Sequence, residues 1–123
     1  MAAILLIEDD AAVRLLLKRI LEQRGHDVIE ASDGGEGLRL FGEREVELVV
    51  TDIVMPDKDG VETIIDLRRK DPGLRIIAIS GGGTTTAGPT WLRAAKLLGA
   101  NRTLEKPFSP KQFLEAVHEV LGG

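Results

Sequence analysis

The chain has 123 residues, of which 43% are hydrophobic and 29% are charged, and its formal net charge is −4. This length fits one domain, expected over residues 1–123, with enough apolar residues for a core. The acidic balance argues against nucleic-acid binding, which needs clustered Lys and Arg. The absence of cysteine excludes disulfides and cysteine-based zinc sites, and the two separated histidines, His26 and His118, are expected at the surface.

The amino-terminal segment MAAILLIEDD carries no basic region, and its apolar run ends at Glu8. Such a run is too short for a signal peptide or a membrane span. We therefore expect a cytoplasmic protein that does not enter a membrane.

Short apolar runs alternate along the chain with longer segments whose apolar residues recur at helical spacing. Polar residues able to cap a helix, or glycines able to end one, stand at many of the junctions. The segment 81–89, GGGTTTAGP, is expected to be a loop. In chain order, the expected elements are strand Ala3–Ile7, helix Ala11–Arg24, strand Asp27–Ala31, a helix from Ser32 or Asp33 to Phe41, strand Val46–Thr51, helix Val61–Arg69, strand Leu74–Ile79, helix Thr90–Leu98, strand Thr103–Glu105 and a helix from Ser109 or Pro110 to Leu121.

This alternation of strands and helices predicts a parallel sheet covered by helices on both faces. Right-handed crossovers favour a doubly wound α/β fold, a flavodoxin-like (βα)5 sandwich whose five parallel strands lie in the order 2-1-3-4-5. Ligands of such folds bind outside the carboxyl ends of the strands, at the switch point between strands 1 and 3. Residues that follow these two strands are therefore the first candidates for a functional site.

Acidic residues stand at both of these strand ends. Glu8, Asp9 and Asp10 follow the first expected strand, and Asp52 follows the third. Asp10 is expected to cap the first helix, whereas the other three should converge in one crevice. Like charges held close together repel and raise each other's pKa. A bound cation relieves this repulsion, and an all-oxygen site of this kind suits Mg²⁺.

The residues after the remaining strands fit a phosphoryl group. Ser80 follows the fourth expected strand, and Lys106 follows the fifth. Asp52 can act as a carboxylate nucleophile, which forms an aspartyl phosphate. A Mg²⁺ ion, an ammonium and a hydroxyl could then hold the three phosphoryl oxygens, because phosphoryl transfer depends mostly on positioning and charge stabilisation.

Four motifs in this order carry a resemblance to a known family: ILLIEDD at 4–10, DIVMPDKDG at 52–60, IIAISG at 76–81 and LEKPF at 104–108. The chain resembles the CheY-like receiver domains of two-component response regulators over essentially its whole length. Carried over to matching positions, the family's roles make Asp52 the phosphoacceptor, Glu8, Asp9, Asp52 and the Val54 carbonyl the Mg²⁺ ligands, Ser80, Gly81 and Lys106 the phosphoryl-binding and switch residues, and Lys106–Pro107 a cis peptide.

The resemblance also implies a function and its partners. A sensor histidine kinase or a histidine phosphotransfer protein would donate the phosphoryl group. The domain would catalyse only its own phosphorylation and dephosphorylation and would not be an enzyme for other substrates. The face formed by helix 90–98, strand 103–105 and the last helix would then bind a downstream protein, or the group would pass onward. The last helix is expected to end at Leu121 with no output domain after it, so we expect a stand-alone receiver, or one excised from a longer protein, as a monomer or weak homodimer.

Three positions depart from the family pattern. Thr103 occupies the position where the family often has Tyr or Phe as a rotameric switch, so this coupling is absent or replaced. The stretch from Ser80 to Lys106 is longer than in typical receivers by about four residues, within 81–89. Val54 borders the expected phosphoryl group with an apolar side chain that cannot orient a water, which implies a long-lived phosphoryl group.

Other interpretations remain open at this point. An aspartate-nucleophile hydrolase of the haloacid dehalogenase type needs Asp-x-Asp, but Val54 stands two residues after Asp52. A pseudo-receiver would bind partners without phosphate. Asp52 taken alone could also be a turn or helix cap, and Trp91 could be a core residue or an exposed interface residue. The calcium-loop, P-loop and dinucleotide motifs all fail at required positions.

Overall fold

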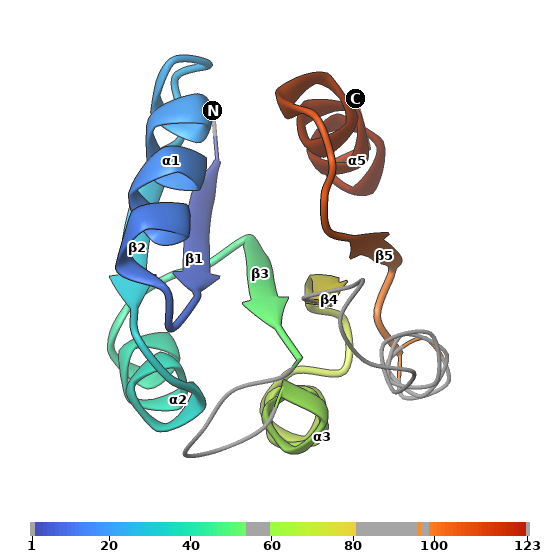
Figure 1. Cartoon of the computed structure of the whole chain (residues 1–123). Coiled ribbons are helices and arrows are strands. Elements are labelled where there is room, and N and C mark those ends of the chain that lie inside the picture. Colours follow the sequence, from blue (N-terminus) through green and yellow to red (C-terminus); the bar gives the residue numbers. More distant parts are fainter. Residues whose placement is uncertain (1, 54–59, 81–95, 97–98, 123) are drawn as a thin grey trace.

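The computed structural model describes residues 2–53, 60–80, 96 and 99–122. Strands and helices alternate along these residues (Figure 1). The elements are β1 (Ala3–Ile7), α1 (Ala11–Glu22), β2 (Asp27–Ala31), α2 (Gly34–Glu43), β3 (Leu48–Asp52), α3 (Gly60–Lys70), β4 (Arg75–Ser80), β5 (Arg102–Glu105) and α5 (Pro110–Val120).

The five strands form one parallel sheet in the order β2-β1-β3-β4-β5. The predicted doubly wound fold and strand order are therefore confirmed. In the register of the sheet, Ile7 at the end of β1 pairs with Thr51 of β3, and Asp52 pairs with Ile79 of β4. The carboxyl ends of β1, β3 and β4 therefore lie together along one border of the sheet, here called the carboxyl edge. The amino-terminal ends of the strands form the opposite edge.

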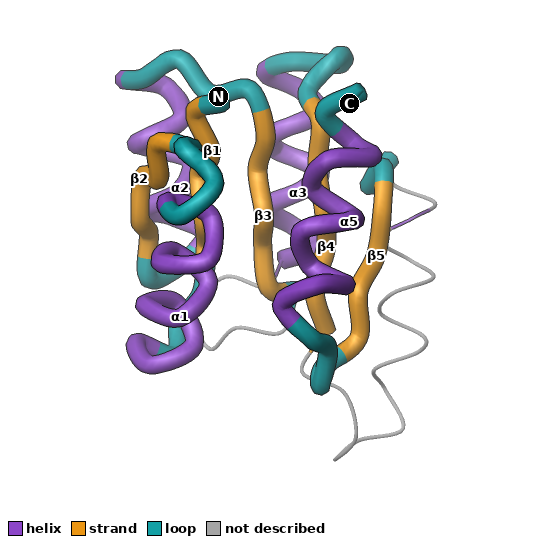
Figure 2. The backbone as a smooth tube through the Cα atoms, turned by 90° about the horizontal axis from the view of Figure 1, so that it is seen from above, coloured by secondary structure: helices purple, strands orange, loops and turns teal. Residues whose placement is uncertain are grey.

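Helices cover both faces of this sheet, with α1 and α5 on one face and α2 and α3 on the other (Figure 2). Side chains alternate between the two faces along each strand. In β1, Ile4 and Leu6 join the core under α1 and α5, whereas Leu5 and Ile7 join the core next to α2 and α3. Burial on both faces explains why the strands read as continuous apolar runs.

The helix termini follow the capping signals of the sequence. Asp10, Asp33 and Ser109 are N-caps, and Ser109 forms a capping box with Gln112. The first helix ends at Glu22, two residues before the predicted end. The amide of Arg24 donates to the Leu21 carbonyl at 3.0 Å in a tightened last turn, and Gly25, with φ of 84°, closes the turn.

The third strand also differs from its prediction. It begins at Leu48 rather than at Val46. The Val46 side chain is only partly buried and packs against the core on the α2 and α3 face, so it covers the edge of that core before the strand begins.

The surface prediction holds for His118, which is exposed, but it is wrong for His26, which is only 8% exposed. The amide of Ala2 donates to His26 Nδ1 at 3.1 Å, and the His118 ring lies edge-on at a centroid distance of 6.4 Å. His26 therefore contacts the residue before β1 and a residue of α5, although its place between a helix and a strand predicted a surface position.

Some predictions fall on residues outside the described part of the chain. These are the loop 81–89 and all of helix Thr90–Leu98 except Lys96, which includes the position of Trp91. In the segments that the structure describes, no helix combines the length and the apolar character that crossing a membrane requires.

Candidate functional site

Two acidic side chains are buried at the carboxyl edge of the sheet. Glu8 follows β1 directly and is 1% exposed, and Asp52 ends the neighbouring strand β3 and is 4% exposed. Asp9 is exposed beside them. One carboxylate oxygen from each of the three residues lies within 4.8 Å of the others. The structure thus brings together the three acids that the sequence predicted to converge.

Lys106 reaches these acids from the position after β5, which lies two strands away from β3 in the sheet. Its amide donates to the Ser80 carbonyl at 3.0 Å, which fixes the backbone next to β4. Its ammonium lies 2.9 Å from Glu8 Oε1 and 3.2 Å from Asp52 Oδ2. The Lys106–Pro107 peptide bond is cis. One ammonium therefore contacts two of the three carboxylates.

Burial and charge set the protonation behaviour of the site. Burial raises the pKa of Glu8 to about 7; the hydrogen bond from Lys106 opposes this shift, and the negative charge of Asp52 adds to it. Burial acts to lower the pKa of Lys106, but the hydrogen bond to Glu8 and the charge of Asp52 outweigh it and raise that pKa. The ammonium offsets part of the acidic charge, and the remaining carboxylate oxygens leave a site suited to a cation.

The donor set fits Mg²⁺, which prefers carboxylate, carbonyl, water and phosphate oxygens. Glu8, Asp9 and Asp52 could each supply one such oxygen. The predicted carbonyl ligand, Val54, lies outside the described residues. Every ligand atom that the structure places here is an oxygen, which matches a hard cation and not a soft one.

Ser80 lies on β4, the strand between Asp52 and Lys106, and Thr103 lies on β5, the strand that leads to Lys106. Ser80 ends β4, is 1% exposed and pairs with Glu105 of β5. Thr103 is half-buried on β5 and pairs with Ala78. Gly81, predicted to bind the phosphoryl group with Ser80, lies outside the described residues.

Sequence reasoning missed one residue that contacts the site. The Arg14 guanidinium donates from Nη1 to the backbone carbonyl of Glu8 at 2.7 Å. The sequence indicates part of this contact. Arg14 lies four residues after the N-cap Asp10, and helical side chains tilt toward the amino terminus of their helix, so the Arg14 side chain is directed toward the turn that carries Glu8. Its acceptor is a backbone oxygen, which no motif displays.

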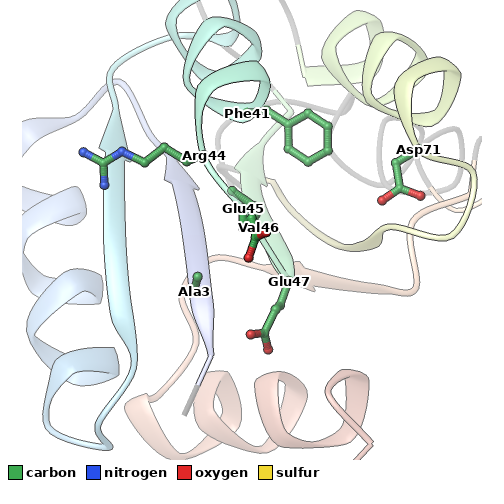
Figure 3. Close-up of a pocket in the computed structure, with 7 residues that line it drawn as sticks. All are labelled: Ala3, Phe41, Arg44, Glu45, Val46, Glu47 and Asp71. Atoms are coloured by element: carbon green, nitrogen blue, oxygen red, sulfur yellow. The ribbon is translucent and has the colours of Figure 1, made fainter.

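A cavity of about 450 Å³ lies at the opposite edge of the sheet (Figure 3). Its lining includes Ala3 at the start of β1, Glu47 just before β3, Phe41 of α2 and Asp71 after α3. None of the candidate site residues that the structure describes lines it. The cavity is therefore separate from the acidic site.

Comparisons with known proteins show which family the chain is similar to. The sequence model of the response regulator receiver domain matches residues 4–118. The sensor kinase CckA of Brucella abortus is 38% identical over 98% of this chain, and the chemotaxis protein CheY of Thermotoga maritima is 31% identical over 95%. The chain spans 12% of the kinase but 95% of that CheY.

A solved structure shares the fold. The CheY-like receiver domain protein from Methanospirillum hungatei superposes with a TM-score of 0.87 at 30% identity, covering 98% of this chain and 94% of that one. The family match extends over both strand ends that carry the buried acids and over Lys106. The chain therefore belongs to the response regulator receiver domain family.

Proposed function

We propose that this domain is a phosphoacceptor, in which Asp52 receives a phosphoryl group from a phosphohistidine in a Mg²⁺-dependent reaction. The observation that carries the proposal is the convergence of Glu8, Asp9 and Asp52 with the Lys106 ammonium at one edge of the sheet. Family membership supports it, since receivers belong to two-component signalling. The donor would be a sensor histidine kinase or a histidine phosphotransfer protein, and the reaction would be cytoplasmic.

In the reaction, a carboxylate oxygen of Asp52 forms a bond to phosphorus while the phosphorus–nitrogen bond breaks and its electron pair returns to the imidazole. Mg²⁺ held by Glu8, Asp9, Asp52 and the Val54 carbonyl would supply positive charge to the transferring oxygens. Lys106, already 3.2 Å from Asp52 Oδ2, would donate to one phosphoryl oxygen and offset its charge.

The proposed readout follows from the position of Ser80 and Lys106. Both residues end or follow strands at the same edge, and the Lys106 amide is bonded to the Ser80 carbonyl. Ser80 and Gly81 would close on the phosphoryl group together with Lys106. This movement would shift the face formed by residues 90–98, β5 and α5, where a downstream protein would bind or from which the group would pass on. Only its own modification would be catalysed.

The test is the intact mass of the protein after incubation with Mg²⁺ and acetyl phosphate. Wild type should gain one phosphoryl group, and Asp52→Asn should gain none, as should wild type without Mg²⁺. Asp71→Asn, which removes an acid at the opposite edge of the sheet, should react as wild type does. A wild type that takes up no phosphoryl group, and binds no beryllofluoride, would contradict the proposal and favour a phosphate-independent binding module.

A further inference from the structure

Arg14 connects the turn after β1, which carries Glu8 and Asp9, to the outermost strand β2. Its Nη1 donates to the Glu8 carbonyl at 2.7 Å, and its Nε pairs with Glu30 Oε1 on β2 at 3.4 Å. Its side chain is 20% exposed. We propose that Arg14 is a positioning residue that sets the direction of Asp9 and thereby tunes Mg²⁺ affinity. The inference rests on the proposed function for its metal, and it assigns Arg14 no contact with that metal.

The peptide plane explains how a bond to one carbonyl can orient the next side chain. The carbonyl of Glu8 and the amide of Asp9 belong to the same planar unit, so fixing one fixes the other. On the other side, the Glu8 amide donates to the Ala31 carbonyl at 3.0 Å. Asp9 is exposed, so its direction depends on this backbone more than on packing.

The end of this turn is held as well. The Asp10 amide donates to Glu8 Oε2 at 3.1 Å, and the Asp10 side chain accepts from the amides of Ala12 and Val13. The amide of Arg14 donates to the Asp10 carbonyl at 2.9 Å. Arg14 thus adds the contact that ties the middle of the turn, the Glu8–Asp9 peptide, to the first turn of α1.

Glu30 holds the Arg14 side chain from the outer side, and a second residue that pairs with Glu30, Lys18, provides a matched control. Lys18, one turn further along α1, pairs with the same Glu30 carboxylate at 3.8 Å and with Glu22 at 3.7 Å. Neither Lys18 contact involves Glu8. Lys18 therefore shares the helix and the outer partner of Arg14 but not its contact with the site.

The experiment measures Mg²⁺ affinity by isothermal titration, together with urea unfolding in the absence of metal. Arg14→Met should weaken Mg²⁺ binding about tenfold, because partners that orient metal ligands typically contribute that much. Arg14→Lys should restore part of the affinity, since an ammonium can still reach one of the two acceptors. Lys18→Met should bind Mg²⁺ as wild type does. Glu30→Gln, which removes only the outer partner, should weaken binding less than Arg14→Met.

A purely structural role would give a different pattern. Arg14→Met and Lys18→Met would then lower unfolding stability alike and leave Mg²⁺ affinity unchanged, which would overturn the inference. If Arg14→Met does not fold, an unchanged Mg²⁺ affinity in both Arg14→Lys and Glu30→Gln would also overturn it. A wild type that binds Mg²⁺ without taking up a phosphoryl group would contradict the proposed function alone, and a wild type that binds no Mg²⁺ would overturn the inference too.

Discussion

Lys106 Nζ lies 2.9 Å from Glu8 Oε1, so a cation that follows the last strand neutralises an acid that follows the first. The same ammonium is 3.2 Å from Asp52. Glu8 and Asp52 are both buried, and buried acids without a partner are costly. The site is therefore held together by charge as well as by the sheet.

Replacing Lys106 with methionine should destabilise the metal-free protein, because two buried carboxylates lose their cation. We expect the free energy of unfolding, measured in urea at neutral pH, to fall by about 3 kcal/mol. Added Mg²⁺ should restore part of it, since a cation in the site would again offset the acids. Lys111→Met, an exposed change on α5, is the matched control. Equal stability of the two variants would contradict this view of the site.

Arg68 makes a second set of contacts, at the opposite edge of the sheet. Its guanidinium donates to the carbonyls of Leu74 and Gly99, to Pro72 O at 3.1 Å and to Asn101 Oδ1 at 3.1 Å. These bonds tie the end of α3 to the segments that enter β4 and β5. Arg68 is thus hydrogen-bonded to residues that precede β4 in the chain and to residues that follow it.

Arg68→Met should lower the free energy of unfolding by about 2–4 kcal/mol, because several charged hydrogen bonds are lost and carbonyls are left without a donor. Arg69→Met is the control, since its side chain is exposed on the same helix. The measurement is urea unfolding of both variants beside wild type. A loss no larger in Arg68→Met than in Arg69→Met would show that solvent replaces these bonds.

The close approach of α2 to β1 predicts opposite effects for two glycines of one helix. A Cβ at Gly37 would lie 2.8 Å from Ile7 Cγ1, whereas a Cβ at Gly42 would meet nothing within 4 Å. Gly37→Ala should destabilise by about 1–3 kcal/mol through overpacking. Gly42→Ala should stabilise by about 0.5–1 kcal/mol through helix propensity. Thermal unfolding of both variants checks this, and an equal change in both would contradict the packing.

Much of the site was predictable because parallel strands end at a common edge. Acids after β1 and β3 had to meet once the strand order was 2-1-3-4-5, which is one of the common doubly wound orders that an alternation of strands and helices allows. Lys106 was harder, because only a long side chain can span β4 to reach Asp52. The family motif placed it, and the distance of 3.2 Å places its ammonium beside Asp52.

The contacts of Arg14, Arg68 and His26 were not predictable in the same way. Both arginines donate to backbone carbonyls, whose positions depend on how each helix is rotated against the sheet. A residue pattern gives the buried stripe of a helix but not the reach of a long polar side chain at its border. The burial of His26 depends on the Ala2 amide and on α5, which are far from it in sequence.

His26 should make stability depend on pH. Burial lowers its pKa below 6.5, and the positive charges of the amino terminus and His118 lower it further. Nδ1 accepts a hydrogen bond from the Ala2 amide, so the neutral ring carries its proton on Nε2, for which the described residues offer no acceptor. Protonating Nδ1 would break the bond to Ala2.

The folded protein therefore binds this proton less readily than the unfolded chain does. The stabilising contribution of neutral His26 should be fully present above pH 6.5 and should be lost as pH falls through the lower pKa of the folded state. Urea unfolding between pH 5 and 8 measures it. His26→Gln should remove this part of the pH dependence. His118→Gln should keep a smaller dependence that ends at a higher pH on the acid side, because the His118 charge that lowers the folded-state His26 pKa is gone while the unfolded value stays the same. A wild-type profile that matches that of His26→Gln would show that the ring is solvated in solution.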